Sequence, residues 1–195
     1  MKATLIVAAA FAVVASASVD AAPQRLLIPD DLYKMRDVSN PQIAPDGNWI
    51  AYTVRTVDTK ADKHESHIWM TRFDGSQTVQ LTGRAKESED APRFSPDGKW
   101  LAFTSGRADD KKNAALWLLN RAGGEAQKLT DLKGGVVDYA WSPDGKKIAV
   151  VATDPDPNDK DGKDDDDKTQ KPIVIDRYYF MEDVTGYLTH QRDHL

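Results

Sequence analysis

Apolar and polar residues alternate in short runs along most of this chain, and one such run occurs three times. Each copy has a Pro-Asp-Gly triplet followed by an apolar stretch with a central alanine, and the copies cover residues 43–53, 94–104 and 141–151. The aspartates of the triplets, at 46, 97 and 144, are 51 and then 47 residues apart. Alternation predicts strands. A WD-like repeat of about 40–50 residues that contains several strands is typical of β-propeller blades.

Each Pro-Asp-Gly triplet predicts a tight hairpin turn. The proline presets the first central torsion, the glycine supplies a positive φ, and a bulge is expected at the glycine. The strand after each turn has a small residue between two larger ones. We expect the large side chains to fill the gap between neighbouring blades and the alanine to allow close approach by the next strand. These positions are Ile50, Ala51 and Tyr52, then Leu101, Ala102 and Phe103, then Ile148, Ala149 and Val150.

Further strands repeat in the same order. Residues 67–71 match 115–119 and residues 79–82 match 127–130, which gives four strands in each unit. Polar loops are expected at 55–66 and 105–113. All five tryptophans lie on predicted strands, four of them at matched positions, which favours packing between blades over a carbohydrate-binding surface.

The third unit is interrupted by an acidic loop at 154–171, and the final residues 192–195 line up with residues 66–68 of the first unit. The predicted fold is therefore all-β: an incomplete β-propeller of about two and a half four-stranded blades over residues 41–195. The blades are expected to start near 41, 91 and 136. Because closed propellers have typically 4–8 blades, we expect this sequence to be an N-terminal fragment of a longer protein.

The first 21 residues match a signal peptide. Lys2 precedes an apolar run at 5–15, and small residues that suit cleavage follow it. The run is too short to span a bilayer, which needs about 20 apolar residues. We therefore expect a periplasmic or secreted protein with no membrane attachment after signal removal.

Residues 22–40 are expected to form an N-terminal segment with one short amphipathic helix. Asp30 is the predicted N-cap, and Leu32, Met35 and Val38 recur at a spacing of three residues. Pro41 is expected to end the helix.

Charge and cysteine content exclude some functions. The chain has 26 basic and 31 acidic residues and no cysteine, so no disulfide supports the fold. Residues 154–168 contain eight aspartates and three lysines, and the rest of the chain is balanced. Without a basic stripe, nucleic acid is not an expected partner.

No cofactor or metal is expected. His64 and His67, and His190 and His194, have spacings found in zinc sites, but they fall on predicted loops and strand ends without the glutamate of a catalytic zinc motif. The acidic loop aligns only in part with a calcium-binding loop, since Pro157 and Lys168 stand where carboxylates are needed. Whether that loop binds calcium is left open by the sequence.

Three features together resemble the prolyl oligopeptidase family, in its bacterial acylaminoacyl-peptidase and dipeptidyl-aminopeptidase branch. They are the leading helix with residues 30–32, the Pro-Asp-Gly repeats, and the stretch at 176–180 and 186–188. The resemblance implies a propeller that controls peptide access to a C-terminal α/β-hydrolase domain beyond residue 195, in an exported serine peptidase. TolB-type propellers carry the same repeat, so a periplasmic protein-interaction module without catalysis is the alternative.

No catalytic residue is expected within these 195 residues. A hydrolase nucleophile needs a G-x-S-x-G elbow, and no serine here has glycines two residues away on both sides. Arg177, Tyr178 and Tyr179 lie outside the simple repeat and are the candidate substrate contact.

Overall fold

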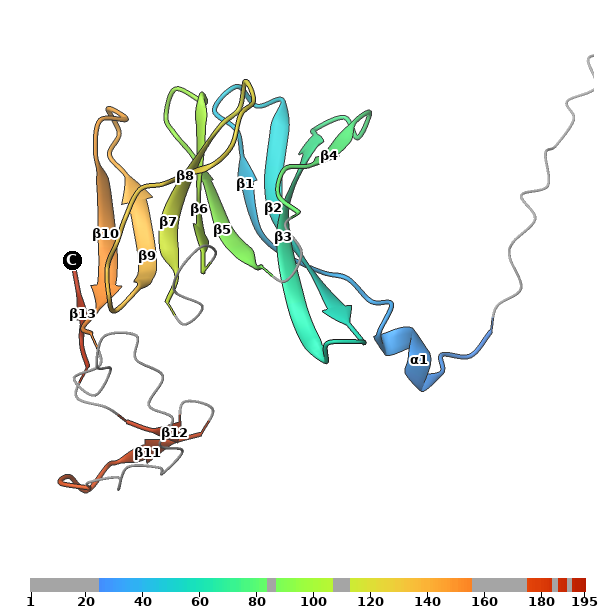
Figure 1. Cartoon of the computed structure of the whole chain (residues 1–195). Helices are drawn as coiled ribbons and strands as arrows, with labels where there is room; N and C mark the ends of the chain where they lie inside the picture. The colour runs from blue at the N-terminus through green and yellow to red at the C-terminus, as the bar shows by residue number, and fades with distance from the viewer. Residues whose placement is uncertain (1–24, 84–86, 107–112, 156–174, 184–185, 189–190) are drawn as a thin grey trace, which may run out of the picture.

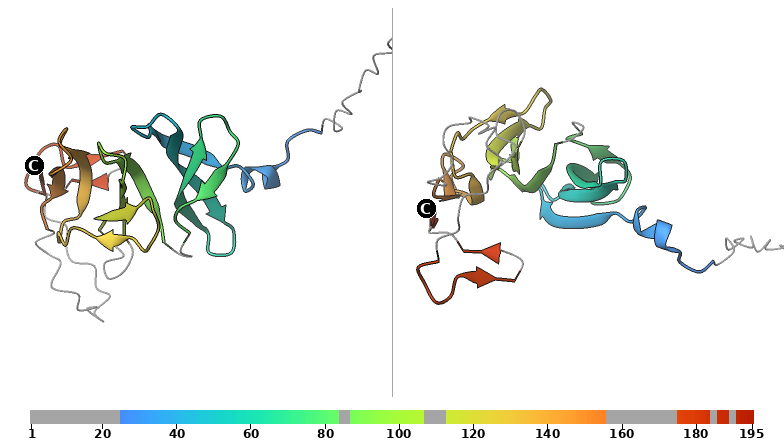
Figure 2. Two further views of the ribbon diagram at one scale, coloured as in Figure 1. Left: turned by 90° about the horizontal axis from the view of Figure 1, so that it is seen from above. Right: turned by 60° about the horizontal axis from the view of Figure 1, so that its bottom comes forward.

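The computed structural model describes residues 25–83, 87–106, 113–155, 175–183, 186–188 and 191–195, and these form consecutive antiparallel sheets (Figure 1). Residues 1–24, which include the whole proposed signal peptide, and residues 156–174, which include most of the acidic loop, lie outside the described part. Along the chain, sheet 1 lies within residues 37–80, sheet 2 within residues 89–128, and sheet 3 within residues 136–153 together with 193–194. Figure 2 shows sheet 2 between sheets 1 and 3 in both views. Sheet 1 has the order β1 (Asp37–Ile43), β2 (Trp49–Asp58), β3 (Lys63–Arg72) and β4 (Thr78–Gln80). Sheet 2 has the order β5 (Glu89–Phe94), β6 (Trp100–Ser105), β7 (Ala115–Asn120) and β8 (Gln127–Lys128).

Sheet 3 is shorter in the described part of the chain. It pairs β9 (Val136–Trp141) with β10 (Ile148–Thr153) and β10 with β13 (Asp193–His194), and a separate hairpin joins β11 (Met181–Glu182) to β12 (Gly186–Tyr187). His194 lies opposite Ala152, as His67 lies opposite Val54 in sheet 1. The expected match between residues 192–195 and the third strand of the first unit is thus confirmed. The predicted all-β, incomplete propeller is confirmed as well.

The three Pro-Asp-Gly turns have the same structure. The amide of Gly47 donates to the carbonyl of Ala44 at 2.8 Å, and the corresponding bonds in the second and third turns are 2.8 Å and 2.9 Å. The three glycines have φ values of 69°, 70° and 69°, which is the left-handed region that glycine adopts without strain. The predicted type of turn is confirmed, and it occupies equivalent corners of the three sheets.

The apolar core lies between the sheets. The cluster between sheets 1 and 2 consists of Ala51, Ile68, Leu101, Phe103, Ala115 and Trp117. The cluster between sheets 2 and 3 consists of Ala102, Leu116, Val136 and Tyr139. Side chains of successive strand residues point to opposite faces, so sheet 2 contributes to both clusters. Trp117 is buried and Trp49, Trp69, Trp100 and Trp141 are half-buried, in agreement with packing as their role.

The predicted N-terminal helix is wrong in length and in its ends. Helix α1 (Pro29–Leu32) has Ile28 at its N-cap, and strand β1 already begins at Asp37. Pro41 therefore lies inside a strand instead of ending a helix. It follows Asn40, whose φ of 51° marks a bulge where the register of β1 against β2 shifts. Among the described residues no helix is long and apolar enough to cross a membrane.

The predicted polar loop at 55–66 is also wrong over most of its length. Strands β2 and β3 pair continuously from Trp49–Arg72 to Asp58–Lys63, so only the residues around 59–62 form a turn. The polar composition did not indicate this cross-strand pairing. It extends the β2–β3 hairpin beyond the flanking strands β1 and β4 of the same sheet (Figure 1). The other predicted loop, at 105–113, falls largely outside the described residues.

Candidate functional site

The candidate substrate contact lies directly before the β11–β12 hairpin, which Figure 1 shows below sheet 3 and apart from the four-stranded sheets. The side chain of Tyr178 is fully exposed and that of Tyr179 is 62% exposed. Arg177 is half-buried, and its Nη2 donates to the carbonyl of Leu188 at 2.5 Å. Arg177 therefore holds the two ends of the hairpin together, while the two tyrosines face solvent and are free to contact another molecule.

Three strands present a free edge on the same side of their sheets: β1, β5 and β9 are each the first strand of a blade and each lies at a sheet edge. In a propeller the first strands line the central axis. Proline interrupts two of these edges, at Pro41 after Asn40 and at Pro92 after Ala91, where φ is 51° and 52°. A proline in an edge strand removes a donor and blunts the edge against further strand pairing.

Charged side chains on these first strands are held in contacts between blades. Asp90 Oδ1 accepts hydrogen bonds from Asn40 Nδ2 and Thr53 Oγ1 of sheet 1, each at 2.8 Å. Arg93 donates to Asp138 of sheet 3 at 2.7 Å, and its guanidinium carbon lies 4.8 Å from the centre of a tyrosine ring in the same strand as Asp138. These groups therefore join one blade to the next.

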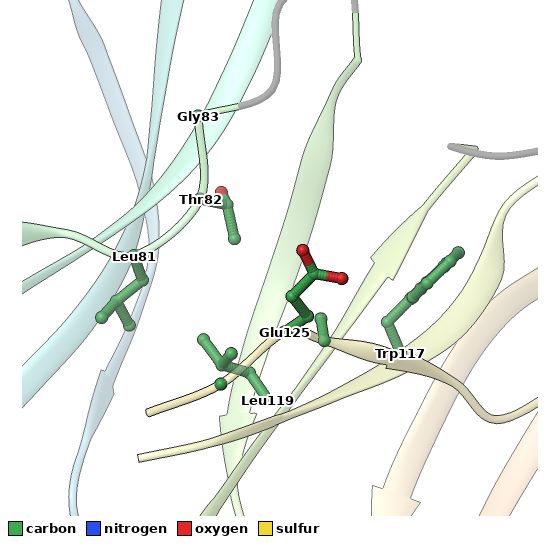
Figure 3. Close-up of a pocket in the computed structure, with 8 residues that line it drawn as sticks. Leu81, Thr82, Gly83, Trp117, Leu119 and Glu125 are labelled. Atoms are coloured by element: carbon green, nitrogen blue, oxygen red, sulfur yellow. The ribbon is translucent and has the colours of Figure 1, made fainter. Parts of the chain in front are cut away.

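A cavity of about 300 Å³ opens between sheets 1 and 2 near their outer strands (Figure 3). Leu81, Thr82 and Gly83 form one wall, and Trp117 and Leu119 contribute to the other. In Figure 3 the carboxylate of Glu125 points into the space between Thr82 and Trp117. The hydroxyl oxygen of Thr82 accepts a hydrogen bond from the amide of Ile68 at 2.9 Å, which fixes its position in this wall.

The histidines do not gather into one site. His67 Nδ1 lies 2.9 Å from Glu89 Oε2, where sheet 1 meets sheet 2, and His194 Nε2 lies 3.0 Å from Asp154 Oδ1 in sheet 3. His64 is exposed, and His190 lies outside the described residues. No cluster of three or more potential metal ligands occurs in the described ranges.

Sequence reasoning missed one repeated feature, the X-Pro pairs, and the structural role of another, the Leu-Thr pairs within the matched stretches 79–82 and 127–130. The X-Pro pairs at 40–41 and 91–92 each stand four residues before the proline of a turn, and both form bulges. The Leu-Thr pairs at 81–82 and 129–130 each supply a threonine hydroxyl that accepts a backbone amide of the third strand, at 2.9 Å. Both signals were present in the sequence as fixed offsets within the repeat.

No family model matches this chain. It is 38% identical over 84% of its length to the uncharacterized peptidase YuxL of Bacillus subtilis, of which it covers 24%. It is 25% identical over 79% of its length to dipeptidyl-peptidase 5 of Porphyromonas endodontalis, of which it covers 22%. The chain thus spans about a quarter of the length of the curated relatives it matches.

Solved structures agree on the fold. The acylaminoacyl peptidase of Pyrococcus horikoshii matches 83% of this chain and 23% of its own, with a TM-score of 0.60 and 22% identity. The β-propeller domain of the Trilobed protease from Pyrococcus furiosus matches 61% of this chain and 34% of its own, with a TM-score of 0.50 and 24% identity. A protein described as TolB from Agrobacterium tumefaciens matches 63% of this chain and 41% of its own, with a TM-score of 0.50 and 25% identity.

The resemblance drawn from the leading segment, the repeats and the 176–188 stretch is confirmed by these comparisons. The chain carries a propeller part of the kind found in the prolyl oligopeptidase family. The comparisons support a peptidase-associated propeller domain, and the peptidase relatives extend well beyond the part that this chain matches.

Proposed function

Because the chain resembles the propeller part of the prolyl oligopeptidase family in sequence and in fold, we propose that it is the substrate-gating part of an exported serine peptidase. The main support for this proposal is the similarity of most of this chain to the uncharacterized peptidase YuxL of Bacillus subtilis. Such an enzyme would hydrolyse short peptides or release units from peptide N-termini. The serine, aspartate and histidine would come from an α/β-hydrolase domain encoded beyond residue 195.

The blunted edges of β1 and β5 support a gate. A propeller axis lined by free strand edges would bind extended peptides by strand addition and retain them. The bulges at Asn40-Pro41 and Ala91-Pro92 interrupt that pairing in the first two blades. An extended peptide can then move along the propeller axis without pairing with the edges of β1 and β5. A folded protein is too large to enter.

In this proposal the exposed pair Tyr178 and Tyr179 contacts the peptide, and Arg177 positions them through its bond to Leu188. Aromatic side chains supply large contact area at low entropic cost. Export rests on the signal-like residues 1–21, and the periplasmic or secreted location is part of the same proposal.

The alternative function is a periplasmic interaction module of TolB type that catalyses nothing. It is favoured by the match to the TolB protein of Agrobacterium tumefaciens. The two functions differ in what the gene encodes after residue 195. A hydrolase needs a G-x-S-x-G elbow followed by an aspartate and a histidine, and a binding module needs none of these.

The test is to produce the protein from its complete coding sequence. We expect release of chromophore from dipeptidyl and N-acetyl-aminoacyl substrates, covalent labelling by a fluorophosphonate, and cleavage of peptides but not of folded proteins. Tyr178→Ala with Tyr179→Ala should raise KM with little change in kcat, and Tyr33→Ala, an exposed tyrosine near α1, is the matched control. A product without the elbow and without labelling would favour the TolB-type alternative.

A further inference from the structure

The cavity between sheets 1 and 2 lies away from the peptide path proposed above. It opens beside β4 and β8, the last strands of their sheets, whereas the free edges of β1 and β5 belong to the first strands. One wall follows β4 directly, and the other includes residues 124–126 just before β8. Sheets 1 and 2 already pack on each other through the core cluster between them, so a further blade cannot enter this space.

Both walls of the cavity are held in place by contacts within the described chain. The amide of Leu81 donates to the carbonyl of Ile68 at 2.8 Å, and the amide of Ile68 donates to the hydroxyl of Thr82. In the opposite wall Trp117 is a buried member of the core cluster, and Leu119 packs against that cluster. The cavity therefore has an aliphatic and aromatic floor whose shape does not depend on a ligand.

Glu125 brings a negative charge to this apolar space. Its carboxylate points into the cavity (Figure 3), and no hydrogen bond or ion pair joins it to another residue in the part of the chain that the structure describes. The two basic residues closest in sequence are held by other groups. Arg121 donates to the carbonyl of Gly98 at 2.9 Å, and Lys128 pairs with Asp131 at 2.8 Å. A carboxylate at the rim of an apolar cavity is complementary to a cation that carries an apolar stem.

We propose that the cavity binds a primary ammonium group on an aliphatic stem, with the ammonium at Glu125 and the stem between Leu81 and Leu119. A lysine side chain and a free alkylamine share this chemistry. The volume of about 300 Å³ lies at the lower end of small-molecule sites, which suits a ligand of this size. A hard metal ion fits less well, because it needs six or more oxygen ligands and Glu125 is the one carboxylate among the described residues that line the cavity.

The stem and the charge contribute differently to binding. Methylene groups buried against Leu81, Leu119 and Trp117 supply affinity whether or not the ligand is charged. Glu125 is exposed, so water and salt screen its attraction to the ammonium. We therefore expect weak binding, with a preference of about fivefold for an amine over the alcohol of the same length, and a smaller preference at high salt. This inference does not depend on the protein being a peptidase.

Saturation-transfer NMR measures this preference on the protein produced from its complete coding sequence. Pentylamine should bind about fivefold more tightly than pentan-1-ol, and Glu125→Gln should make the two affinities equal. Asp62→Asn removes an exposed charge in the β2–β3 turn and should preserve the preference. Equal affinities in the unmodified protein, or a preference that survives Glu125→Gln, would overturn the proposal.

Filling the cavity tests where the amine binds. Ala126 lines the cavity, and Ala126→Leu should weaken the binding of both pentylamine and pentan-1-ol about fivefold. Ala122→Leu, in the exposed turn before it, is the matched control and should change neither affinity. Far-ultraviolet circular dichroism checks that each variant still forms its sheets. Unchanged binding in a folded Ala126→Leu variant, or no binding of pentylamine to the unmodified protein, would overturn the proposal.

A second ligand distinguishes the two sources of the ammonium group. Nα-acetyl-lysine methylamide carries the same ammonium and stem as pentylamine and adds a peptide backbone. Tighter binding than pentylamine would identify a lysine of a polypeptide as the natural ligand, and equal or weaker binding would identify a free amine. Either result supports the site only if Glu125→Gln weakens it, and loss of that dependence for both ligands would overturn the proposal.

Discussion

Pro45 of the first turn packs against Gly98 of the second: a Cβ placed on Gly98 would lie 3.6 Å from Cδ of Pro45. The next boundary repeats the contact, since a Cβ on Gly145 would lie 3.5 Å from Cδ of Pro96. Each proline thus presets the torsion of its own turn and covers the glycine of the following one. The turns keep the sheets in a common register.

Replacing Gly98 by leucine should cost more stability than replacing Gly47. Both glycines have φ near 70°, so both variants carry the same backbone strain of about 1–2 kcal/mol. A Cβ at Gly47 would meet nothing within 4 Å, whereas a Cβ at Gly98 would already contact Pro45 and Arg121, which leaves less room for the rest of a leucine side chain. We expect Gly98→Leu to lose roughly 1–3 kcal/mol more than Gly47→Leu in urea unfolding. Equal losses would show that the turns do not pack.

Thr82→Val should destabilise the chain through one lost acceptor. The hydroxyl accepts the amide of Ile68 in a buried setting, and valine keeps the shape while leaving that amide without its partner. We expect a loss of about 1–3 kcal/mol. Thr130→Val removes the equivalent bond to Leu116 and should act similarly. The exposed Thr78→Val is the control and should change the free energy of unfolding by less than about 0.5 kcal/mol.

The second turn should titrate at acid pH through Asp97. The hydroxyl of Ser95 donates to its carboxylate at 2.6 Å and, with the amide of Lys99, lowers the pKa of Asp97 below its ordinary value. A lowered pKa means that the stabilisation is present above the ordinary pKa near 4 and is lost as the pH falls through the lowered value. Ser95→Ala should raise the pKa of Asp97 in a carboxyl NMR titration and weaken the chain at neutral pH.

The third turn gives an internal repeat of this experiment. Ser142 donates to Asp144 at 2.6 Å, and the pKa of that carboxyl is lowered by the same bond. Ser142→Ala should therefore shift Asp144 and leave Asp97 unchanged. A shift of neither carboxyl in its own serine variant would mean that the serine hydroxyls do not stabilise the ionised aspartates.

The repeat could be predicted from the sequence because its signals are local. Pro45, Asp46 and Gly47 specify a turn through their own torsions and side-chain bonds, and the alternation after them specifies a strand. The helix around residue 30 could not be bounded in the same way. The apolar spacing of Leu32, Met35 and Val38 suits a helix, but pairing with β2 draws Val38 into a strand.

The candidate site was only partly accessible from sequence for a similar reason. Tyr178 and Tyr179 stood out because they interrupt the repeat, and they are exposed in the structure. The role of Arg177 depends on a contact with Leu188, eleven residues away, which no local pattern encodes. Nor does composition distinguish the exposed Ala149 from the buried Ala51 and Ala102. That difference depends on which sheet faces them.

Tyr139 should make the chain sensitive to alkaline pH. Its phenol lies 2.5 Å from the carbonyl of Ala91 and 2.8 Å from that of Ala102, and burial raises the pKa of Tyr139 well above the ordinary value near 10. A raised pKa means that its stabilisation is complete below pH 10 and is lost as the pH rises towards the folded value, because the unfolded chain ionises first.

Tyr139→Phe separates this effect from packing, since the ring is retained and only the hydroxyl is removed. At pH 7 we expect the variant to be less stable by about 1–2 kcal/mol, the cost of a buried hydrogen bond. Between pH 9 and 11 its free energy of unfolding should fall less steeply than that of the unmodified chain. Tyr179→Phe, which alters an exposed phenol, should change neither value. Parallel pH profiles for Tyr139→Phe and the unmodified chain would rule out Tyr139 as the titrating group, because the slope above pH 9 would then come from other residues.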